Sequence, residues 1–263
     1  LRATVERMTD KPYDVVITHG HPDHAGMMHQ FERVYMNEKD LPLLPWAART
    51  DFDLNEFHWN NRLHVGDWSV WEVTEDMINR GSLDTQVLPL NEGDVFDLGG
   101  RRVTAHALPG HSAGHIGIVT PDGAAYLGDC LIDHDQIAAA KLPTSMFIAR
   151  DLESKQRLHE LDAPAYIVAH KQVLTERAAF DALIDENIAF IHAKERELLD
   201  DLTDGMTFSD WIAAFCRRED IRTHNELKFS VVERNFSNFA AWLTDSGRVA
   251  IQREFCAKRY YRA

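Results

Sequence analysis

Hydrophobic positions in the first part of the chain change between helical and strand spacing. Residues 1–12 have the pattern of a short amphipathic helix that ends at a proline. The apolar run Tyr13–Thr18 comes next and predicts a buried strand. Helical spacing returns over residues 25–34, whereas residues 40–64 are rich in Pro and Trp and poorly periodic. We interpret residues 40–64 as a surface insertion or a helical excursion.

Short β-type runs dominate the middle of the chain. Between residues 68 and 130 they are broken by turn sequences such as Asn91–Asp94 and Pro121–Gly123. This texture predicts antiparallel hairpins. The segment from 131 to about 150 is irregular in pattern, and a helix near residues 151–161 and a strand over Ala165–Ala169 follow it.

The last part of the chain has the pattern of three helices and a β-hairpin. Helical spacing covers residues 175–202, Phe208–Arg217 and 226–246. Two short β runs, Val249–Gln252 and Cys256–Tyr261, complete the chain, with Gly247 and Arg253 at the expected turns. This order is the plan of a winged helix.

Composition and charge place the chain among ordinary globular proteins. It has 263 residues, of which 44% are hydrophobic and 27% charged, which excludes disordered and collagen-like classes. The net charge of -14 argues against a protein that coats nucleic acid or anionic membranes. Residues 203–263 carry +2 and the rest carries -16. We therefore expect two domains, a larger domain over residues 1–185 and a smaller C-terminal domain over residues 186–263.

Cysteine usage and the lack of long apolar runs bear on location. The three cysteines are far apart and odd in number. We therefore expect no disulfide framework, and we expect the protein to reside in a reducing compartment. The sequence has no run of 18 apolar residues and no charged-then-apolar leader. We expect a cytoplasmic protein that does not bind membranes.

A cluster of metal-ligand residue types follows the first predicted strand. His19, His21, Asp23 and His24 lie one or two residues apart in a loop at the end of that strand. Imidazoles and carboxylates at this spacing on a rigid scaffold can reach two adjacent metal ions. Two close metal ions lower the pKa of a shared water and polarise a carbonyl or phosphoryl oxygen, so this pattern favours hydrolysis.

Four motifs together resemble the metallo-β-lactamase superfamily, with a glyoxalase II-like motif set. They are the segments Thr18–His24, Pro109–His115, Gly128–Cys130 and Ala169–His170, each at the end of a predicted strand. The resemblance covers about residues 5–175. It implies an α/β (α+β) fold, an αββα sandwich with a dinuclear metal site at one edge.

The resemblance also implies a ligand set. His19, His21 and His111 would bind the first metal, Asp23, His24 and His170 the second, and Asp129 would bridge both. Zinc is the first choice, and manganese or iron also suit imidazole and carboxylate ligands. A hydroxide bridged between the two metals would attack the substrate, and Asp23 is the candidate catalytic group that holds or relays its proton.

Other polar residues near the motifs have weaker assignments. We expect His115 to support the ligands or to pack the hairpin rather than to bind metal. His134 suits a solvated loop better than the substrate mouth, and Lys171 suits an anionic substrate and a plain surface position equally. Cys130, beside Asp129, points to the opposite side and is interpreted as core filler.

One departure from the family pattern concerns the N-terminus. Only 18 residues precede His19, where members of the family usually have further strands. We expect a longer natural N-terminus or strands supplied by another chain, because one sheet would otherwise expose its edge.

The favoured function is hydrolysis of an ester-type bond in a small molecule, a thioester or a lactone, in keeping with the acidic catalytic part. The alternative is an endoribonuclease or other phosphodiesterase of the same superfamily. A metal-free scaffold protein is disfavoured by the complete ligand set, and a flavodiiron-type redox role by the lack of a flavin domain. For the C-terminal part we favour a structural, dimerising or pocket-capping role over nucleic-acid binding, although it carries several basic residues: Lys228, Arg234, Arg248, Arg253, Lys258, Arg259 and Arg262.

Overall fold

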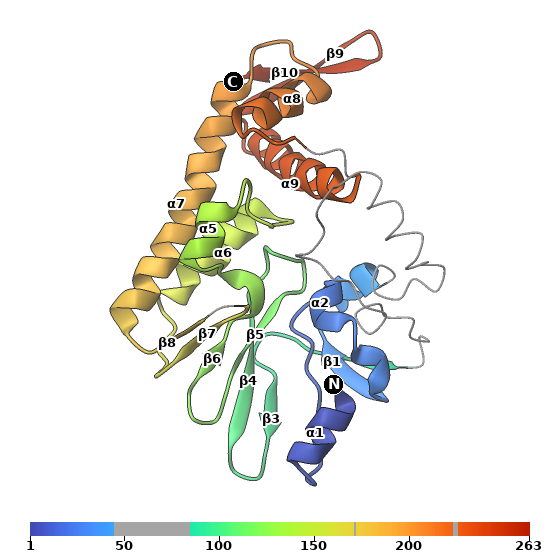
Figure 1. Ribbon diagram of the computed structural model, residues 1–263, viewed down its shortest axis with the longest axis vertical. Coiled ribbons are helices and arrows are strands. Elements are labelled where there is room, and N and C mark those ends of the chain that lie inside the picture. The colour runs from blue at the N-terminus through green and yellow to red at the C-terminus, as the bar shows by residue number, and fades with distance from the viewer. Residues whose placement is uncertain (45–84, 171, 223–225) are drawn as a thin grey trace.

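The computed structural model describes residues 1–44, 85–170, 172–222 and 226–263 (Figure 1). Strands lie at one end of the molecule, and the C-terminal helices with a final hairpin lie at the other. The chain begins with α1 (Arg2–Met8), an exposed helix that the amphipathic pattern predicts. Part of the poorly periodic stretch, residues 45–64, lies outside the described residues.

Six strands form the main sheet, in the order β3-β4-β5-β6-β7-β8. All neighbours are antiparallel except β6 and β7, which are parallel. The hairpins predicted before residue 130 are therefore confirmed for β3 to β6. The strands are β3 (Val95–Asp97), β4 (Arg102–Ala107), β5 (Ile116–Val119), β6 (Ala125–Tyr126), β7 (Tyr166–Val168) and β8 (Gln172–Leu174).

A second, smaller sheet pairs β1 (Arg33–Met36) with β2 (Gln86–Pro89) in parallel. Within the described ranges, the segment predicted as a strand before His19 forms a single isolated bridge, between Val16 and Tyr35, and no regular strand. Ile17 N donates to the carbonyl oxygen of Tyr35, and Tyr35 N donates to the carbonyl oxygen of Val15, each at 2.8 Å.

The helix predicted over residues 25–34 is wrong. The chain instead forms α2 (Pro22–Ala25), the 3-10 helix η1 (Met28–Gln30) and then β1. In β1, Val34 and Met36 are fully buried and alternate with more exposed neighbours. This period of two suits pairing with β2, and it prevails over the helical spacing that the same apolar residues also satisfy.

Three apolar clusters lie between successive layers of helices and sheets, and these layers form an αββα sandwich. Met28 and Phe31 pack outside the small sheet, and Ala105 and Ile116 pack between the two sheets. On the far face of the main sheet, a third cluster that includes Phe180 packs against α6 (Ile148–Leu158) and α7 (Arg177–Asp201). The sandwich inferred from the motifs is thus the observed fold.

Residues 131–150 contain more structure than their irregular pattern predicts. They include α5 (His134–Ala139), and α6 begins within them. A capping box starts α5: the Asp133 side chain accepts from the backbone of Gln136, and the Gln136 side chain accepts from the backbone of Asp133. This local signal is present in the sequence, but the helix is too short for periodicity to reveal it.

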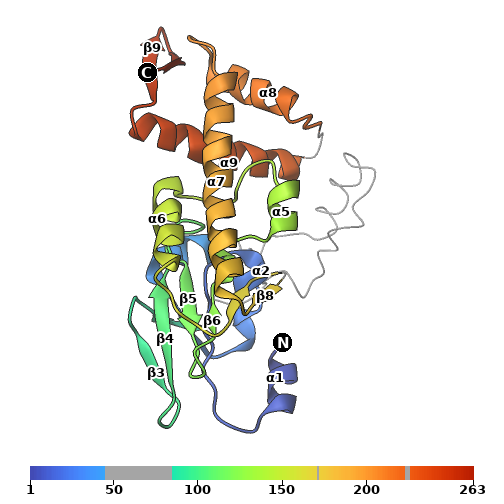
Figure 2. The same ribbon diagram turned by 90° about the vertical axis from the view of Figure 1, so that its left-hand side faces the viewer.

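The three C-terminal helices and the hairpin are observed where the pattern predicts them. After α7 come α8 (Phe208–Arg218), α9 (Glu226–Asp245) and the antiparallel strands β9 (Val249–Glu254) and β10 (Ala257–Arg262). Arg253, predicted at the turn, instead lies in β9 opposite Lys258. Whether this arrangement is a winged helix stays a prediction. The predicted domain boundary after residue 185 falls inside α7, which runs from the main sheet to α8 (Figures 1 and 2).

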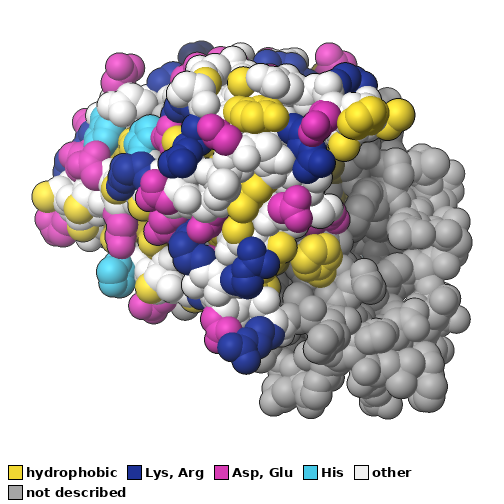
Figure 3. Space-filling view, turned by 90° about the horizontal axis from the view of Figure 1, so that it is seen from above, with side chains coloured by type: hydrophobic (Ala, Val, Ile, Leu, Met, Phe, Trp, Pro, Cys, Tyr) yellow, Lys and Arg dark blue, Asp and Glu magenta, His cyan; other side chains and the backbone are white. Residues whose placement is uncertain are grey.

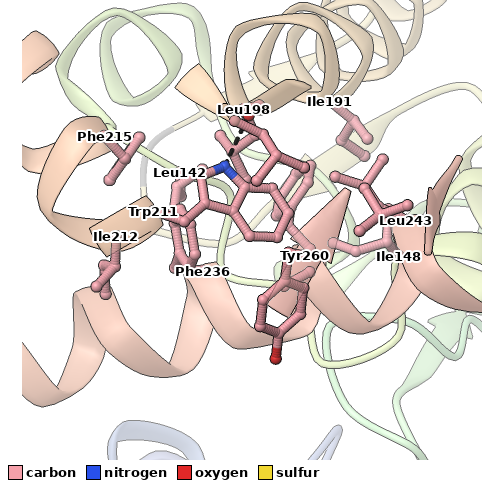
Figure 4. Close-up of a cluster of buried hydrophobic side chains, with 14 residues drawn as sticks. Leu142, Ile148, Ile191, Leu198, Trp211, Ile212, Phe215, Phe236, Leu243 and Tyr260 are labelled. Atoms are coloured by element: carbon pink, nitrogen blue, oxygen red, sulfur yellow. Dashed lines mark hydrogen bonds between the residues drawn. The ribbon is translucent and has the colours of Figure 1, made fainter. Parts of the chain in front are cut away.

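One apolar cluster joins the C-terminal helices to the sandwich (Figure 4). Its centre is Trp211, which is fully buried and donates from Nε1 to the carbonyl oxygen of Leu198 at 2.8 Å. Phe236 and Tyr260 pack against the indole, and Leu142 and Ile148 from before α7 belong to the same cluster. Among the described helices, none has the length and apolar character needed to cross a membrane.

Candidate metal centre

Loops at the ends of strands carry the seven predicted ligands to one edge of the sandwich. His19 and His21 follow the extended segment that ends at Thr18, and α2 then presents Asp23 and His24. His111 lies in the loop between β4 and β5, Asp129 in the 3-10 helix η4 (Gly128–Cys130), and His170 after β7. His170 is in the left-handed region with φ 71.

The first ligand group consists of His19, His21 and His111. One ring nitrogen from each lies within 4.8 Å of the others. His21 Nδ1 and His111 Nε2 are 2.8 Å apart. His19 and His111 are buried, so protein groups rather than water surround these two rings.

The second group consists of Asp23, His24, Asp129 and His170, whose ligand atoms also lie within 4.8 Å of one another. Nε2 of His24 and Nε2 of His170 are each 3.3 Å from Oδ1 of Asp129. The other oxygen of Asp129 lies 3.5 Å from His111 Nε2 and 4.0 Å from His19 Nε2. Asp129 therefore presents one oxygen to each group.

Unpartnered polar atoms show that these residues fit metal ions. His19 Nε2 and Asp129 Oδ1 are buried and have no hydrogen-bond partner. Such atoms cost free energy in a protein interior unless something binds them. Imidazole nitrogens and carboxylate oxygens are the donors that zinc, manganese and iron accept. Both groups thus fit the two ions that the family resemblance implies.

Most of the first group is neutral without a metal. Burial, helped by the neighbouring histidines, lowers the pKa of His19 and of His111 far below the ordinary imidazole range. His111 Nδ1 lies 2.7 Å from the carbonyl oxygen of Thr144, which can only accept, so this nitrogen carries the hydrogen. Nε2 of His111 therefore carries a lone pair, which faces His21 Nδ1 and can bind a cation in its place.

The second group is more strongly coupled to charge. Burial alone would raise the pKa of Asp129, but His24 and His111 hold it well below its usual range. Burial lowers the pKa of His24, and the neighbouring carboxylate of Asp129 outweighs that effect and raises it. A metal ion at this group would displace the proton that Asp129 favours on His24.

Asp40 was not anticipated from the sequence, yet it ties the two main ligand loops together. Its fully buried carboxylate accepts from Gly20 N at 3.0 Å, from Ser112 Oγ at 2.6 Å and from Gly114 N at 2.6 Å. The first donor lies between His19 and His21, and the other two flank Ala113 beyond His111. Asp40 follows no motif, and only the folded chain reveals its three donors.

His115 positions Asp129, as predicted, rather than joining the ligand groups. Its Nε2 accepts from the backbone N–H of Asp129 at 3.0 Å, and burial lowers its pKa to about 3. Gly128 has φ 52, and a Cβ there would lie 2.6 Å from this nitrogen. Glycine is therefore required for the close approach.

The remaining candidates lie away from the ligand groups or outside the described residues. Cys130 is buried, and burial raises the pKa of its thiol to about 12, which confirms its interpretation as core filler. His134 is 78% exposed and pairs with Glu186 at 2.6 Å, which links α5 to α7 at the surface. Lys171 is outside the described residues.

Comparison with known proteins identifies relatives of this chain. A family model of the metallo-beta-lactamase superfamily matches residues 5–170. The chain is 28% identical over 133 residues to acyl-coenzyme A thioesterase MBLAC2 of Bos taurus and of Homo sapiens, a match that covers 50% of this chain and 46% of each relative. The chain thus matches about half the length of these curated relatives.

Solved structures share the fold. A metallo-beta-lactamase family protein from Thermus thermophilus superposes with a TM-score of 0.62 at 22% identity, covering 95% of this chain and 79% of its own. A beta-lactamase domain protein from Burkholderia ambifaria has a TM-score of 0.63 at 19% identity, covering 100% of this chain and 80% of its own. At these identities the likeness concerns the fold.

Proposed function

The chain belongs to the metallo-β-lactamase superfamily, and on that premise we propose that it is a dinuclear metal-dependent hydrolase that cleaves a thioester or related ester in a small molecule. The observation that carries the proposal is the position of Asp129, with one carboxylate oxygen toward each ligand group. A carboxylate in that position can serve two ions at once.

The donor set assigns a role to each group. His19, His21 and His111 would hold one ion, Asp23, His24 and His170 the other, and Asp129 both. Zinc is the first expectation, and manganese and iron are alternatives. Two ions so held would lower the pKa of a water molecule and polarise the substrate carbonyl.

Asp23 is the candidate proton carrier. Its side chain is 51% exposed, and its Oδ2 lies 3.6 Å from Nε2 of His24 and of His170. In the proposed reaction, water adds to the carbonyl carbon, the carbon–sulfur bond breaks, and a carboxylic acid and a thiol are released. Asp23 can accept the proton that the water loses and return it to the departing sulfur.

The choice of a small thioester has two supports. The curated relatives are named as acyl-coenzyme A thioesterases. In addition, residues 1–202 carry a net charge of -16, which disfavours long polyanions. Figure 3 looks onto the end formed by the C-terminal elements, where Lys and Arg side chains are interleaved with Asp and Glu. This face offers little continuous basic surface for nucleic acid.

A hydrolysis screen with purified protein of measured metal content tests the proposal. We expect turnover of an acyl thioester and its loss after chelation, with recovery when zinc is returned. A lactone, a phosphodiester and an RNA oligonucleotide are the competing substrates. Metal-dependent cleavage of RNA without turnover of any thioester or lactone would contradict the proposal and favour the endoribonuclease alternative.

A further inference from the structure

One short loop supports the candidate ligand His111. This loop, residues 143–147, lies directly before α6 and beside the β4–β5 loop that carries His111. The carbonyl oxygen of Thr144 accepts from Nδ1 of His111 at 2.7 Å. The backbone N–H of Met146 donates to the carbonyl oxygen of Gly110, the residue before His111, at 2.9 Å. The orientation of the His111 ring therefore depends on the position of loop 143–147.

Backbone hydrogen bonds, rather than its own side chain, hold the Thr144 carbonyl group in place. Thr144 is exposed, so packing of its side chain does not fix the group. Two successive peptide groups flank Ser145. The first joins Thr144 to Ser145, and its N–H donates to the carbonyl oxygen of Pro143 at 3.1 Å. The second joins Ser145 to Met146, and its N–H is the one that donates to Gly110. Three of the four polar ends of these two groups are thus bound within the sandwich.

Asn238 of α9 binds the fourth end. Its Nδ2 donates to the carbonyl oxygen of Ser145 at 2.8 Å. Ser145 is only 1% exposed, so loss of this donor would leave its carbonyl oxygen in a buried environment without that partner. A buried polar group that loses its partner costs free energy, and the backbone around it shifts to reduce that cost. A shift here would act on the adjacent Thr144 carbonyl.

The helix that carries Asn238 is a firm support. It lies between the final hairpin and the sheets (Figure 1). Phe236, Phe239 and Ala240 of α9 are buried in the apolar cluster around Trp211, so the position of Asn238 is set by the packing of the C-terminal part. Supporting groups on rigid helices hold ligands more precisely than groups on loops do.

We propose that Asn238 is a positioning residue for one metal ion: through loop 143–147 it fixes the His111 ring and thereby raises the metal affinity of the group His19, His21 and His111. This inference rests on the proposed function, because it requires that this group holds an ion. A hydrogen bond from Nδ1 to a fixed carbonyl oxygen sets the ring orientation and increases the basicity of Nε2. The C-terminal part thus contributes to the metal centre as well as to stability.

Competition between zinc-loaded protein and a chromogenic chelator tests the proposal. Asn238→Leu keeps a side chain of similar size and removes the donor. We expect it to weaken one zinc-binding step about tenfold, the step that His21→Ala abolishes, and to change the other step less. Asn238→Asp, which replaces the donor with an acceptor, should have the same effect and serves if Asn238→Leu does not fold. Asn238→Gln, which keeps an amide donor, should recover part of the affinity.

A spectroscopic readout separates ring orientation from general stability. Cobalt(II) in place of zinc has absorption bands that report the geometry of its ligands. These bands should shift in Asn238→Leu and return toward the original spectrum in Asn238→Gln. Unchanged zinc affinity and an unchanged cobalt spectrum in folded Asn238→Leu would overturn the proposal. An equal loss at both zinc-binding steps would also overturn it.

The matched control is Thr244→Val, in the same helix. Thr244 donates from Oγ1 to the carbonyl oxygen of Ala240 at 2.8 Å, so this variant removes a hydrogen bond that stays within α9. It should leave zinc affinity and the cobalt spectrum unchanged, and a loss as large as that of Asn238→Leu would overturn the role of Asn238. Zinc binding without hydrolysis of any thioester would contradict the proposed function, yet the zinc affinities would still decide the role of Asn238.

Discussion

The metal-binding edge and the Trp211 cluster are stabilised in opposite ways. At the edge, a few buried polar groups with defined hydrogen bonds fix the loops, as Asp40 and His115 do. Around Trp211, large apolar side chains from several helices and β10 fill a common core. The edge therefore depends on geometry and charge, whereas the cluster contributes mainly free energy of folding.

Among the described residues, contacts from the segment before α7 and from α9 join the two regions. Leu142 and Ile148 enter the Trp211 cluster from the catalytic part, and Asn238 contacts the loop beside Thr144. Changes in the cluster should consequently alter stability and leave the metal-binding edge intact. Changes at the edge should alter metal binding and catalysis at similar stability.

Removing the centre of the cluster should have the largest effect. We expect Trp211→Ala to lower the free energy of unfolding by about 3–5 kcal/mol, because a fully buried indole and its hydrogen bond are lost. Denaturant titration measures this. Phe255→Ala is the control, since Phe255 is 99% exposed and should change stability by less than about 0.5 kcal/mol. The separation of the two regions fails if folded Trp211→Ala protein no longer binds zinc.

Next in size is the change at the shared carboxylate. We expect Asp129→Asn to reduce kcat/KM by at least about 100-fold, beyond the loss typical of residues that only support ligands. The cause is the loss of the charge that faces both ligand groups. His134→Ala, at an exposed position paired with Glu186, should keep nearly full activity. Equal activity of the two variants would refute a bridging role for Asp129.

A smaller effect is expected at Asp40. Asp40→Asn would place an amide N–H₂ against at least one of its three donors, so both ligand loops should shift. We expect zinc affinity to fall about tenfold to a hundredfold. Asp97→Asn is the matched control, because Asp97 also accepts two backbone N–H groups but in the exposed β3–β4 turn. Unchanged zinc affinity in Asp40→Asn would show that the loops hold their positions without it.

The smallest expected effect concerns the reactivity of cysteine thiols in the two regions. The raised pKa of Cys130 leaves its thiol protonated at pH 8, and burial blocks access, whereas Cys256 is exposed. Iodoacetamide at pH 8 should modify Cys256 in the folded protein and Cys130 only after unfolding, as peptide mass analysis can show. Rapid modification of Cys130 in the native state would place it at an accessible edge rather than in the core.

Much of the ligand set could be predicted because its signals are local. The residues from His19 to His24 are adjacent in sequence, and His111 and Asp129 lie in short motifs that resemble those of the metallo-β-lactamase superfamily. The long helices α7 and α9 likewise follow from apolar spacing. Positions of this kind need no knowledge of distant contacts.

The residues that were missed depend on tertiary contacts. Asp40 is defined by donors from two other loops, and nothing in its own neighbourhood announces them. The region from residue 25 to 34 was predicted as a helix because the pairing of β1 with the distant β2 cannot be read from spacing alone.

Titration of metal-free protein with zinc, followed at once by calorimetry and by thioester hydrolysis, tests the two-ion centre most directly. Two facing ligand groups that share Asp129 predict two zinc ions per chain, with full activity only after the second equivalent. Asp129→Asn should weaken both binding steps. Full activity at one equivalent with no second binding event, or no zinc binding at all, would contradict the account.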